Sequence, residues 1–361
     1  MNKQMMKAWQ WRGPGDQRLI EMPRPEPGPD ELLVAVEASG LCGTDLRILA
    51  GDYGHARPPV VIGHEFAGTV AGIGRAVTGH AVGDRVAADP NVYCLDCEWC
   101  SRDAYNLCAN IQAIGVSRDG AMAEFVTVPA RLAVRLPDGV DAALGALIEP
   151  LSCVLHGLER GGLTDGGIVQ SGSPGSGDSP TSGGSPASGR SLVVYGAGAI
   201  GLMAVAVAAQ LGAEVTVVEP LATRRDRAEA AGATTATEQL PASGPGGPVA
   251  FDYVLDASGA SRAVADGIGR LRKRGTFIQM GVAPRDFRLP FSPYEVYENE
   301  WRIIGSNSVA DCYQRAADLM PFIGRTMREL VTHTLPLAEL PRATELIADP
   351  SAVKVQIDPR T

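Results

Sequence analysis

The segment from Ser191 to Glu219, SLVVYGAGAIGLMAVAVAAQLGAEVTVVE, constrains the fold more than any other part of the sequence. A β-branched run, LVVY, leads into the hexapeptide GAGAIG at 196–201, and an apolar helical stretch and a second run, EVTVV, follow. This is G-x-G-x-x-G between a strand and a helix, with an acidic residue about 20 positions on, which is typical of a dinucleotide-binding βαβ unit. Two further runs, FDYVLDAS at 251–258 and GTFIQMGV at 275–282, are expected to continue a parallel sheet.

Each glycine of the hexapeptide has a predicted task. Gly196 permits the tight turn, Gly198 lets a pyrophosphate approach the backbone, and Gly201 lets the helix pack close to the sheet. The helix N-terminus then faces the diphosphate. The predicted cofactor-binding residues are Gly196, Gly198, Ile200, Gly201, Glu219 and Arg224.

Glu219 is the residue that bears on the choice between NAD and NADP. Its carboxylate is expected to accept hydrogen bonds from the adenosine ribose hydroxyls and to repel a 2'-phosphate, which favours NAD. Arg224 and Arg225 follow closely, and arginines in this position can hold a 2'-phosphate. We favour a solvated helix face for them, so the sequence predicts NAD, with NADP as the alternative.

Four of the seven cysteines, Cys94, Cys97, Cys100 and Cys108, lie within CLDCEWCSRDAYNLC. The spacing C-x2-C-x2-C-x7-C lets thiolates converge at about 2.3 Å on a tetrahedral zinc ion. Four thiolates leave no position for substrate, so the site is expected to be structural. An iron–sulfur cluster is the rival, but no proline follows the last cysteine and no second cluster is evident.

A second group of candidate ligands is spread along the chain. Cys42 lies in GLCGTD, His64 and Glu65 lie in GHEFAGTV, and Glu149 lies in LIEPL. Taken singly, Cys42 could be a small buried hydrophobe and His64 a satisfied core histidine. One cysteine, one histidine and one or two glutamates together leave a coordination position open, which is the design of a Lewis-acid zinc catalyst.

The length and charge of the chain exclude several classes of protein. With 361 residues it is expected to form two domains, and its net charge of -9 disfavours nucleic acid and anionic lipid as partners. The N-terminal MNKQMMKAWQWRG lacks a signal-peptide core, and the longest apolar run, 199–213, is too short to cross a bilayer. We therefore expect a cytoplasmic protein whose cysteines are thiols or thiolates.

In chain order, the motifs are GLCGTD, GHEFAGTV, VGDRV at 82–86, the cysteine lobe, IEPL and YGAGAIG. This set resembles the zinc-dependent medium-chain dehydrogenase superfamily of alcohol and polyol dehydrogenases, over nearly the whole chain. Glu149, where classical alcohol dehydrogenases carry a cysteine, is similar to the sorbitol, threonine and glucose dehydrogenase branch. The resemblance implies an α/β protein with a GroES-like β-barrel catalytic domain, 1–155 and 290–361, and a Rossmann doubly wound parallel-sheet NAD-binding domain, 156–289.

The resemblance also implies roles for individual residues. Two zinc ions per chain are expected, and the catalytic one would be held by Cys42 and His64 with Glu65 or Glu149 as third ligand. Thr44 resembles the hydroxyl that takes the proton of the alcohol, although it could be only a turn residue. Many relatives carry a histidine where this chain has Arg47, which is permanently charged and cannot relay a proton by titrating. The candidate catalytic residues are Cys42, Thr44, His64, Glu65 and Glu149.

The implied activity is hydride transfer between NAD and a secondary alcohol of a polyol, sugar or cyclitol. Alternatives are an amino-alcohol or sugar-phosphate dehydrogenase, which Arg47 could serve, and a non-catalytic cofactor-binding relative. The last would be expected to lack Cys42, His64 or Thr44, and all three are present. The expected partners are a small alcohol or ketone and a second copy of the chain, in a homodimer or homotetramer.

One segment is foreign to this pattern. Residues 164–189, TDGGIVQSGSPGSGDSPTSGGSPASG, consist mainly of Gly, Ser and Pro, and relatives join these flanks in a few residues. The composition cannot build a packed core, so we expect a flexible insertion on the surface, with a cover for the active site as the alternative.

Overall fold

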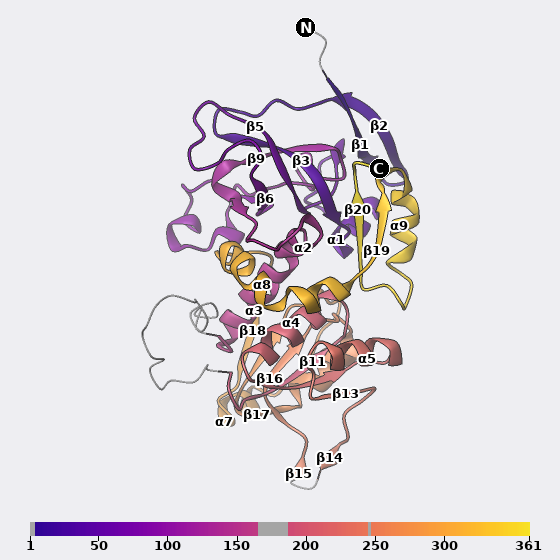
Figure 1. Cartoon of the computed structure of the whole chain (residues 1–361). Helices are drawn as coiled ribbons and strands as arrows, with labels where there is room; N and C mark the ends of the chain where they lie inside the picture. The colour runs from indigo at the N-terminus through magenta and orange to yellow at the C-terminus, as the bar shows by residue number, and fades with distance from the viewer. Residues whose placement is uncertain (1–3, 165–186, 245–246) are drawn as a thin grey trace. The chain divides into compact units, whose positions relative to one another are not determined.

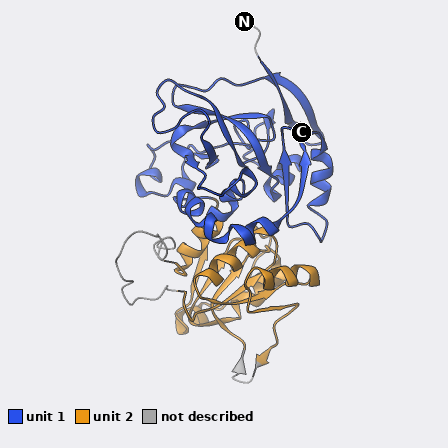
Figure 2. Cartoon of the chain, viewed as in Figure 1, with its two compact units in different colours: residues 1–152, 309–361 blue, residues 153–308 orange. Residues whose placement is uncertain are grey.

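The computed structural model describes residues 4–164, 187–244 and 247–361. The chain divides into two compact units (Figure 2). Unit 1 comprises Met1–Ser152 and Val309–Thr361, and unit 2 comprises Cys153–Ser308. Most of the predicted insertion lies outside the described residues.

Unit 1 is built around a sheet in the order β10-β6-β5-β3-β20-β19 (Figure 1). Its strands and helices are β1 Met5–Gly13, β2 Asp16–Pro23, β3 Glu31–Gly40, α1 Gly43–Ala50, β4 Val60–Val61, β5 Glu65–Ile73, β6 Arg85–Ala88, β7 Asn91–Val92, β8 Gln112–Ala113, β9 Phe125–Pro129, β10 Ala133–Arg135, α2 Ala142–Gly145, α8 Tyr313–Leu330, β19 Val331–Pro336, α9 Leu340–Leu346 and β20 Lys354–Asp358. Four 3₁₀ turns are η1 Cys100–Arg102, η2 Tyr105–Leu107, η3 Ala130–Leu132 and η4 Leu337–Glu339. Helix α3, Ile148–Gly161, runs from unit 1 into unit 2.

Strand β3 organises unit 1 because it has partners along its whole length. It pairs antiparallel with β5, with β9 near its start and with β20 near its end. Its alternate side chains Leu32, Val34 and Val36 enter an apolar core with Phe66 and Val126, as the two-residue period of a strand requires. The far end of β3 therefore brings the starts of β5 and β20 together.

Unit 2 contains a six-stranded parallel sheet in the order β13-β12-β11-β16-β17-β18. Numbered along the chain, these strands run 3-2-1-4-5-6, which is the Rossmann order. Successive strands are added on one side of β11 up to β13 and on its other side from β16 onward, so the strand order reverses between β11 and β16. The elements are β11 Ser191–Tyr195, α4 Ala199–Gln210, β12 Glu214–Val218, α5 Ala222–Ala230, β13 Thr235–Thr237, β14 Ser243–Gly244, β15 Gly247–Pro248, β16 Phe251–Asp256, α6 Ser261–Ile268, β17 Leu271–Gln279, α7 Pro293–Glu298 and β18 Arg302–Gly305. The central β11 is buried at every position, as a strand covered on both faces should be.

The predicted return of the chain to the catalytic domain, from residue 290, is placed too early. Helix α7 precedes β18, and β18 pairs in parallel with β17 as the sixth strand of the unit 2 sheet. The chain enters unit 1 again only at Val309. The first boundary also differs slightly, at 152/153 rather than 155/156, within helix α3.

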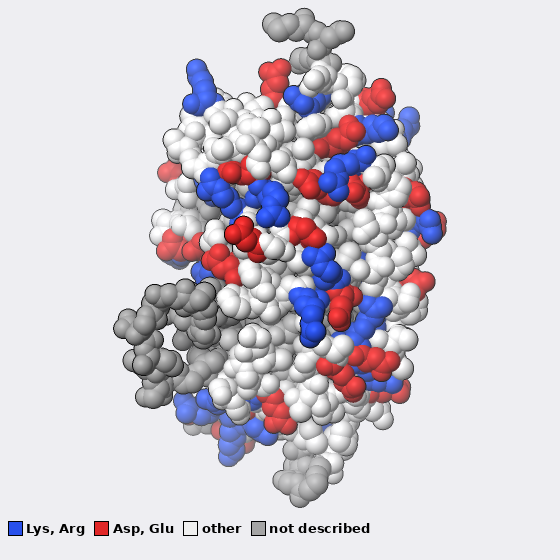
Figure 3. Space-filling view, viewed as in Figure 1, with Lys and Arg blue, Asp and Glu red and all other residues white. Residues whose placement is uncertain are grey.

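Two surface features bear on possible partners. On the face shown in Figure 3, acidic and basic side chains are interspersed on each unit and form no broad basic patch. The stretch Ala142–Gly161 has the length and mean hydropathy, 1.2, of a membrane span, but 72% of its 18-residue apolar window is buried inside the protein. Such burial is typical of a core helix.

Candidate functional site

Three of the predicted metal ligands converge in unit 1. Cys42 follows β3 and begins α1, while His64 and Glu65 lie at the start of β5, where Gly40 and Glu65 are cross-strand partners. The ligand atoms of Cys42, His64 and Glu65 all lie within 4.8 Å of one another. His64 is 8% exposed and Glu65 is 1% exposed. A thiolate, an imidazole and a carboxylate form a donor set that suits zinc, so the residues fit the metal that the sequence predicts.

Asp45, which the sequence analysis did not single out, orients two of these ligands. One of its carboxylate oxygens accepts a hydrogen bond from the backbone N–H of Cys42 at 2.9 Å, and the other lies 3.4 Å from His64 Nδ1. Burial opposes a charged His64, but the negative charges of Asp45 and Cys42 outweigh it, so the pKa of His64 is raised well above its usual value. A carboxylate behind a ligating imidazole fixes the orientation of the ring. The sequence feature that could have revealed Asp45 is its position three residues after Cys42, where an acid often caps the start of a helix.

The two candidate glutamates are placed differently. Glu149 lies in the first turn of α3 and is buried, but within the described residues it does not join the group of converging ligand atoms. Glu65 joins that group and also forms an ion pair with Lys354, at the start of β20. Burial opposes the charge on Lys354, but Glu65 and Cys42 raise its pKa, so the ammonium is charged.

Thr44 and Arg47 both lie on α1, two and five residues after Cys42. Thr44 is the second residue of the helix and is half-buried. The guanidinium of Arg47 lies over the ring of Tyr53, 5.4 Å from its centroid, and donates a long hydrogen bond of 3.4 Å to the carbonyl of Asp52. Arg47 is therefore engaged with its own loop.

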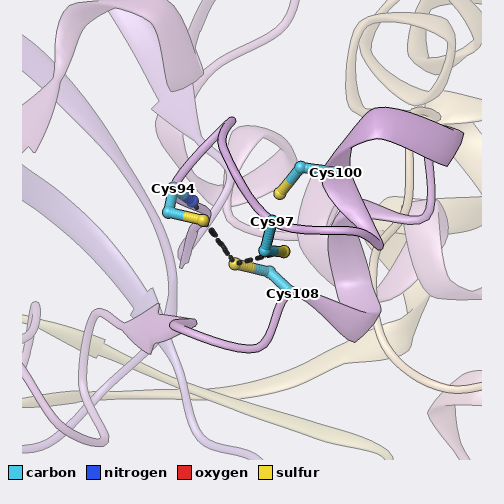
Figure 4. Close-up of side chains that lie close together, drawn as sticks. All are labelled: Cys94, Cys97, Cys100 and Cys108. Carbon is cyan, nitrogen blue, oxygen red and sulfur yellow. Dashed lines mark hydrogen bonds between the residues drawn. The ribbon is translucent and has the colours of Figure 1, made fainter.

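The four cysteines of the lobe turn their sulfur atoms toward one another (Figure 4). Cys108 Sγ lies 3.5 Å from Cys94 Sγ and 3.9 Å from Cys97 Sγ, and no disulfide joins them. The backbone N–H groups of Cys100 and Ala109 lower the pKa of Cys97 to about 6. Four convergent sulfurs with backbone N–H donors form the environment of a closed thiolate metal site.

Asp89 is a buried acid that the sequence analysis did not identify. It is 7% exposed and lines a cavity of about 200 Å³ in unit 1 with Tyr93 and Arg131. Burial raises the pKa of Asp89 to about 7, and the negative charge of Glu149 adds to the effect. A buried acid with a perturbed pKa at a cavity is a candidate for a functional role.

Asp89→Asn is expected to stabilise the protein at neutral and alkaline pH. The pKa of this acid is higher in the folded than in the unfolded chain, so wild-type stability is full below about pH 4 and falls as pH rises toward about 7. The asparagine carries no such cost, so the variant should gain on the order of 4 kcal/mol in free energy of unfolding above pH 7. Urea unfolding of both proteins across this range measures it, and a constant difference at all pH values would contradict it.

The nucleotide loop of unit 2 has the geometry that its sequence predicts. Gly196 has φ +96, which side-chain-bearing residues rarely adopt, and a Cβ on Gly201 would lie 1.9 Å from the carbonyl oxygen of Gly196. A Cβ on Gly198 would meet no described atom within 4 Å, so the space beside it is open to a ligand. Ile200 lies in the first turn of α4, whose N-terminus follows Gly198. The loop therefore fits a dinucleotide.

Glu219 directly follows β12, and its side chain contacts the backbone of the glycine loop. Its carboxylate accepts hydrogen bonds from the backbone N–H groups of Ala197, at 2.8 Å, and Leu221, at 3.0 Å. It also lines a cavity of about 630 Å³ together with Glu238 and Arg262, which the sequence analysis did not identify. Arg225 donates instead to the carbonyls of Glu219 and Pro220, and Arg224 is half-buried on α5.

A metal-ligand group in a β-sheet unit, a four-cysteine lobe and a Rossmann unit define a class of zinc-binding, nicotinamide-dependent oxidoreductases. The family model of the alcohol dehydrogenase GroES-like domain matches residues 28–138, and that of the zinc-binding dehydrogenases matches residues 199–323. The chain belongs to the zinc-dependent medium-chain dehydrogenase family.

Individual relatives align over almost their entire length. The D-altritol 5-dehydrogenase of Agrobacterium fabrum is 34% identical over 353 residues, 97% of this chain and 99% of the relative. The sorbitol dehydrogenase of Halalkalibacterium halodurans is 30% identical over 96% of this chain and 97% of its own. A structure from Sinorhizobium meliloti, described as a zinc-binding dehydrogenase bound to NADP, superimposes with a TM-score of 0.86 at 33% identity, covering 99% of this chain and 100% of that one.

Proposed function

We propose that this protein oxidises a secondary alcohol of a polyol, sugar or cyclitol with NAD, using one catalytic and one structural zinc ion. The alcohol carbon gives a hydride to the nicotinamide, the hydroxyl loses a proton, and a ketone and NADH result. The observation that carries the proposal is the convergence of Cys42, His64 and Glu65 in a chain that also has the glycine turn at 196–201. The relatives named D-altritol 5-dehydrogenase and sorbitol dehydrogenase support a polyol as the substrate.

The residues divide the work as follows. Cys42 and His64 would hold the catalytic zinc with Glu65 or Glu149 as third ligand, and the metal held there would polarise the hydroxyl of the substrate. Asp45 orients His64, and Thr44 would take the hydroxyl proton. The burial of His64 and Glu65 keeps bulk water away, which strengthens the electrostatic interactions. Cys94, Cys97, Cys100 and Cys108 would hold the structural zinc.

The experiment is reduction of NAD by the purified protein across a panel of polyols, sugars, cyclitols and amino alcohols. Metal analysis of the same preparation accompanies it. Activity confined to amino alcohols would replace the proposed substrate class, and absence of activity from a zinc-loaded protein with every member would contradict the proposal. Arg47 is already held by its own loop, so no observation favours the sugar-phosphate alternative.

We expect Glu219→Gln to narrow the preference for NAD over NADP by about tenfold, or about 1.4 kcal/mol, because the carboxylate charge that disfavours a 2'-phosphate is removed. Glutamine keeps the size of the side chain and one acceptor for the loop but removes the charge that faces a 2'-phosphate. The ratio of kcat/KM values for the two cofactors measures the change. Glu238→Gln is the matched control, since Glu238 lines the same cavity without bonding to the loop, and an equal effect there would contradict a specific role of Glu219.

We also propose a cytoplasmic homodimer or homotetramer. The sixth strand, β18, lies at the edge of the unit 2 sheet, and the exposed apolar residues nearby include Phe291, Tyr294, Tyr297 and Ile303. An exposed edge strand with apolar side chains is suited to a second copy of the chain. Light scattering of the purified protein tests this, and a monomer at micromolar concentration would contradict it.

A further inference from the structure

The cavity that Asp89 lines in unit 1 is separate from the group of converging metal ligands. It has a volume of about 200 Å³, and its walls come from the cysteine lobe, from strand β10 and from the start of helix α8. All of its lining residues belong to unit 1. Those with charged or aromatic side chains are Asp89, Tyr93, Tyr105, Arg131, Asp311 and Tyr313.

Asp89 is the buried charge of this cavity. It is 7% exposed, and one of its carboxylate oxygens accepts a hydrogen bond of 2.8 Å from the backbone N–H of Asn91. Burial raises the pKa of Asp89 to about 7 in spite of the positive charge of Arg131. A buried carboxylate is costly unless a cation compensates its charge. The protein therefore compensates Asp89 only in part.

Arg131 is engaged with Tyr93. Its guanidinium donates a hydrogen bond of 2.6 Å to the carbonyl of Tyr93 and lies over the ring, 4.3 Å from its centroid. The same ring stacks on Tyr105, with the centroids 4.5 Å apart. Within the described part of the chain, Arg131 acts on Asp89 through its charge and forms no ion pair with it. The arginine is therefore committed to the aromatic stack.

The other walls of the cavity also suit a positive charge. Asp311 precedes α8, and its negative charge acts on both Tyr93 and Tyr105. When ionised, the two acids and the one arginine of the lining leave a net charge of one negative unit. Aromatic rings, which Tyr105 and Tyr313 contribute here, attract organic cations, whereas a hard metal ion needs several oxygen ligands.

We propose that this cavity binds a small organic ammonium ion, with Asp89 as its counter-ion and tyrosine rings in its walls. Because a water molecule takes about 30 Å³ of liquid volume, the cavity admits a ligand of on the order of six non-hydrogen atoms. The lobe and β10 belong to the first segment of unit 1 and α8 to its last, so the bound ion would hold the two segments together. The inference does not depend on the proposed activity.

The probe is tetramethylammonium chloride, whose cation has five non-hydrogen atoms and no lone pair that could bind zinc. Calorimetric titration of the full-length protein should give a Kd on the order of 1 mM, as expected for so small a ligand. At about 100 mM, the ion should raise Tm by about 5 °C over the same concentration of sodium chloride. Neutral tert-butanol, of equal size, should bind at least about tenfold more weakly.

Two variants change the charge of the lining in opposite directions. Asp89→Asn keeps the size of the side chain but removes the counter-ion, so the affinity should fall by about tenfold or more. Arg131→Met removes a like charge, so the affinity should rise by about threefold. Glu238→Gln is the matched control, because it removes a carboxylate from the cavity of unit 2, and it should leave binding unchanged. Each variant is compared with and without the ion, which separates binding from its own change in stability.

The outcomes decide both the site and the class of its ligand. No binding up to about 100 mM, or a Tm no higher than in sodium chloride, would overturn the site. Asp89→Asn with the affinity of wild type would remove Asp89 as the counter-ion and overturn the proposal. Equal binding of tert-butanol would show a pocket without preference for charge, and weaker binding in Arg131→Met would show that the site favours an anion. Either result would overturn the assignment to ammonium ions.

Discussion

Replacing His64 with alanine is expected to lower turnover by about three orders of magnitude or more and to reduce zinc from two ions per chain to one. The imidazole is one of the three convergent donors, and Asp45 orients it from behind. A metal that polarises a reacting oxygen supplies several kcal/mol of transition-state stabilisation, and each 1.4 kcal/mol is a factor of about ten in rate. Steady-state kinetics and metal analysis of the same samples measure both effects.

The variant should remain folded, because the cysteine lobe and the apolar cores are untouched. His333→Ala is the matched control. His333 lies in the same unit on β19 and bonds to Thr332 Oγ1, outside the group of metal ligands. It should keep both zinc ions and nearly full turnover. Retention of two zinc ions by His64→Ala would remove His64 from the ligand set.

Replacing Cys97 with serine is expected to lower stability rather than turnover, in contrast to His64→Ala. The lobe should lose its zinc, and stability should fall by on the order of several kcal/mol, because a structural metal contributes its binding free energy to folding. Thermal unfolding and metal content measure this. The molecules that remain folded should keep the catalytic zinc and their turnover per catalytic zinc.

Cys153→Ser is the control for the second prediction, because Cys153 belongs to neither group of candidate ligands. It should change stability far less than Cys97→Ser. Iron and sulfide in the wild-type protein would show that the lobe holds an iron–sulfur cluster instead. Equal losses of turnover per catalytic zinc in the His64 and Cys97 variants would contradict the division into a catalytic and a structural site.

The features that the sequence predicted correctly are those encoded over short distances. The strand–turn–helix around 196–201 has its expected form, and the relatives confirm the family that the ordered motifs indicated. The spacing of the lobe cysteines predicted their convergence, because gaps of two residues restrict the geometry. The assignment of individual ligands stays a prediction.

The features that the sequence did not reveal depend on tertiary structure. Lys354 meets Glu65 only because β20 and β5 both pair with the end of β3, and no local pattern encodes that meeting. Asp89 is notable because it is an acid within a buried stretch that includes Ala88 and Asn91, and the raised pKa that results depends on tertiary packing. The return to unit 1 was placed too early because β18, with four residues, is too short for periodicity to reveal.

The pairing of β20 with β3 affects the order in which the two units can fold during synthesis. Unit 2 is one continuous stretch, whereas unit 1 combines the first part of the chain with the last. The nascent N-terminal segment carries Cys42, His64 and Glu65 long before Lys354 is translated. Domains fold as units while synthesis proceeds, so unit 2 can fold first, but unit 1 must wait until strand β20 has been synthesised. The catalytic site is therefore expected to be completed only after the Rossmann unit has folded.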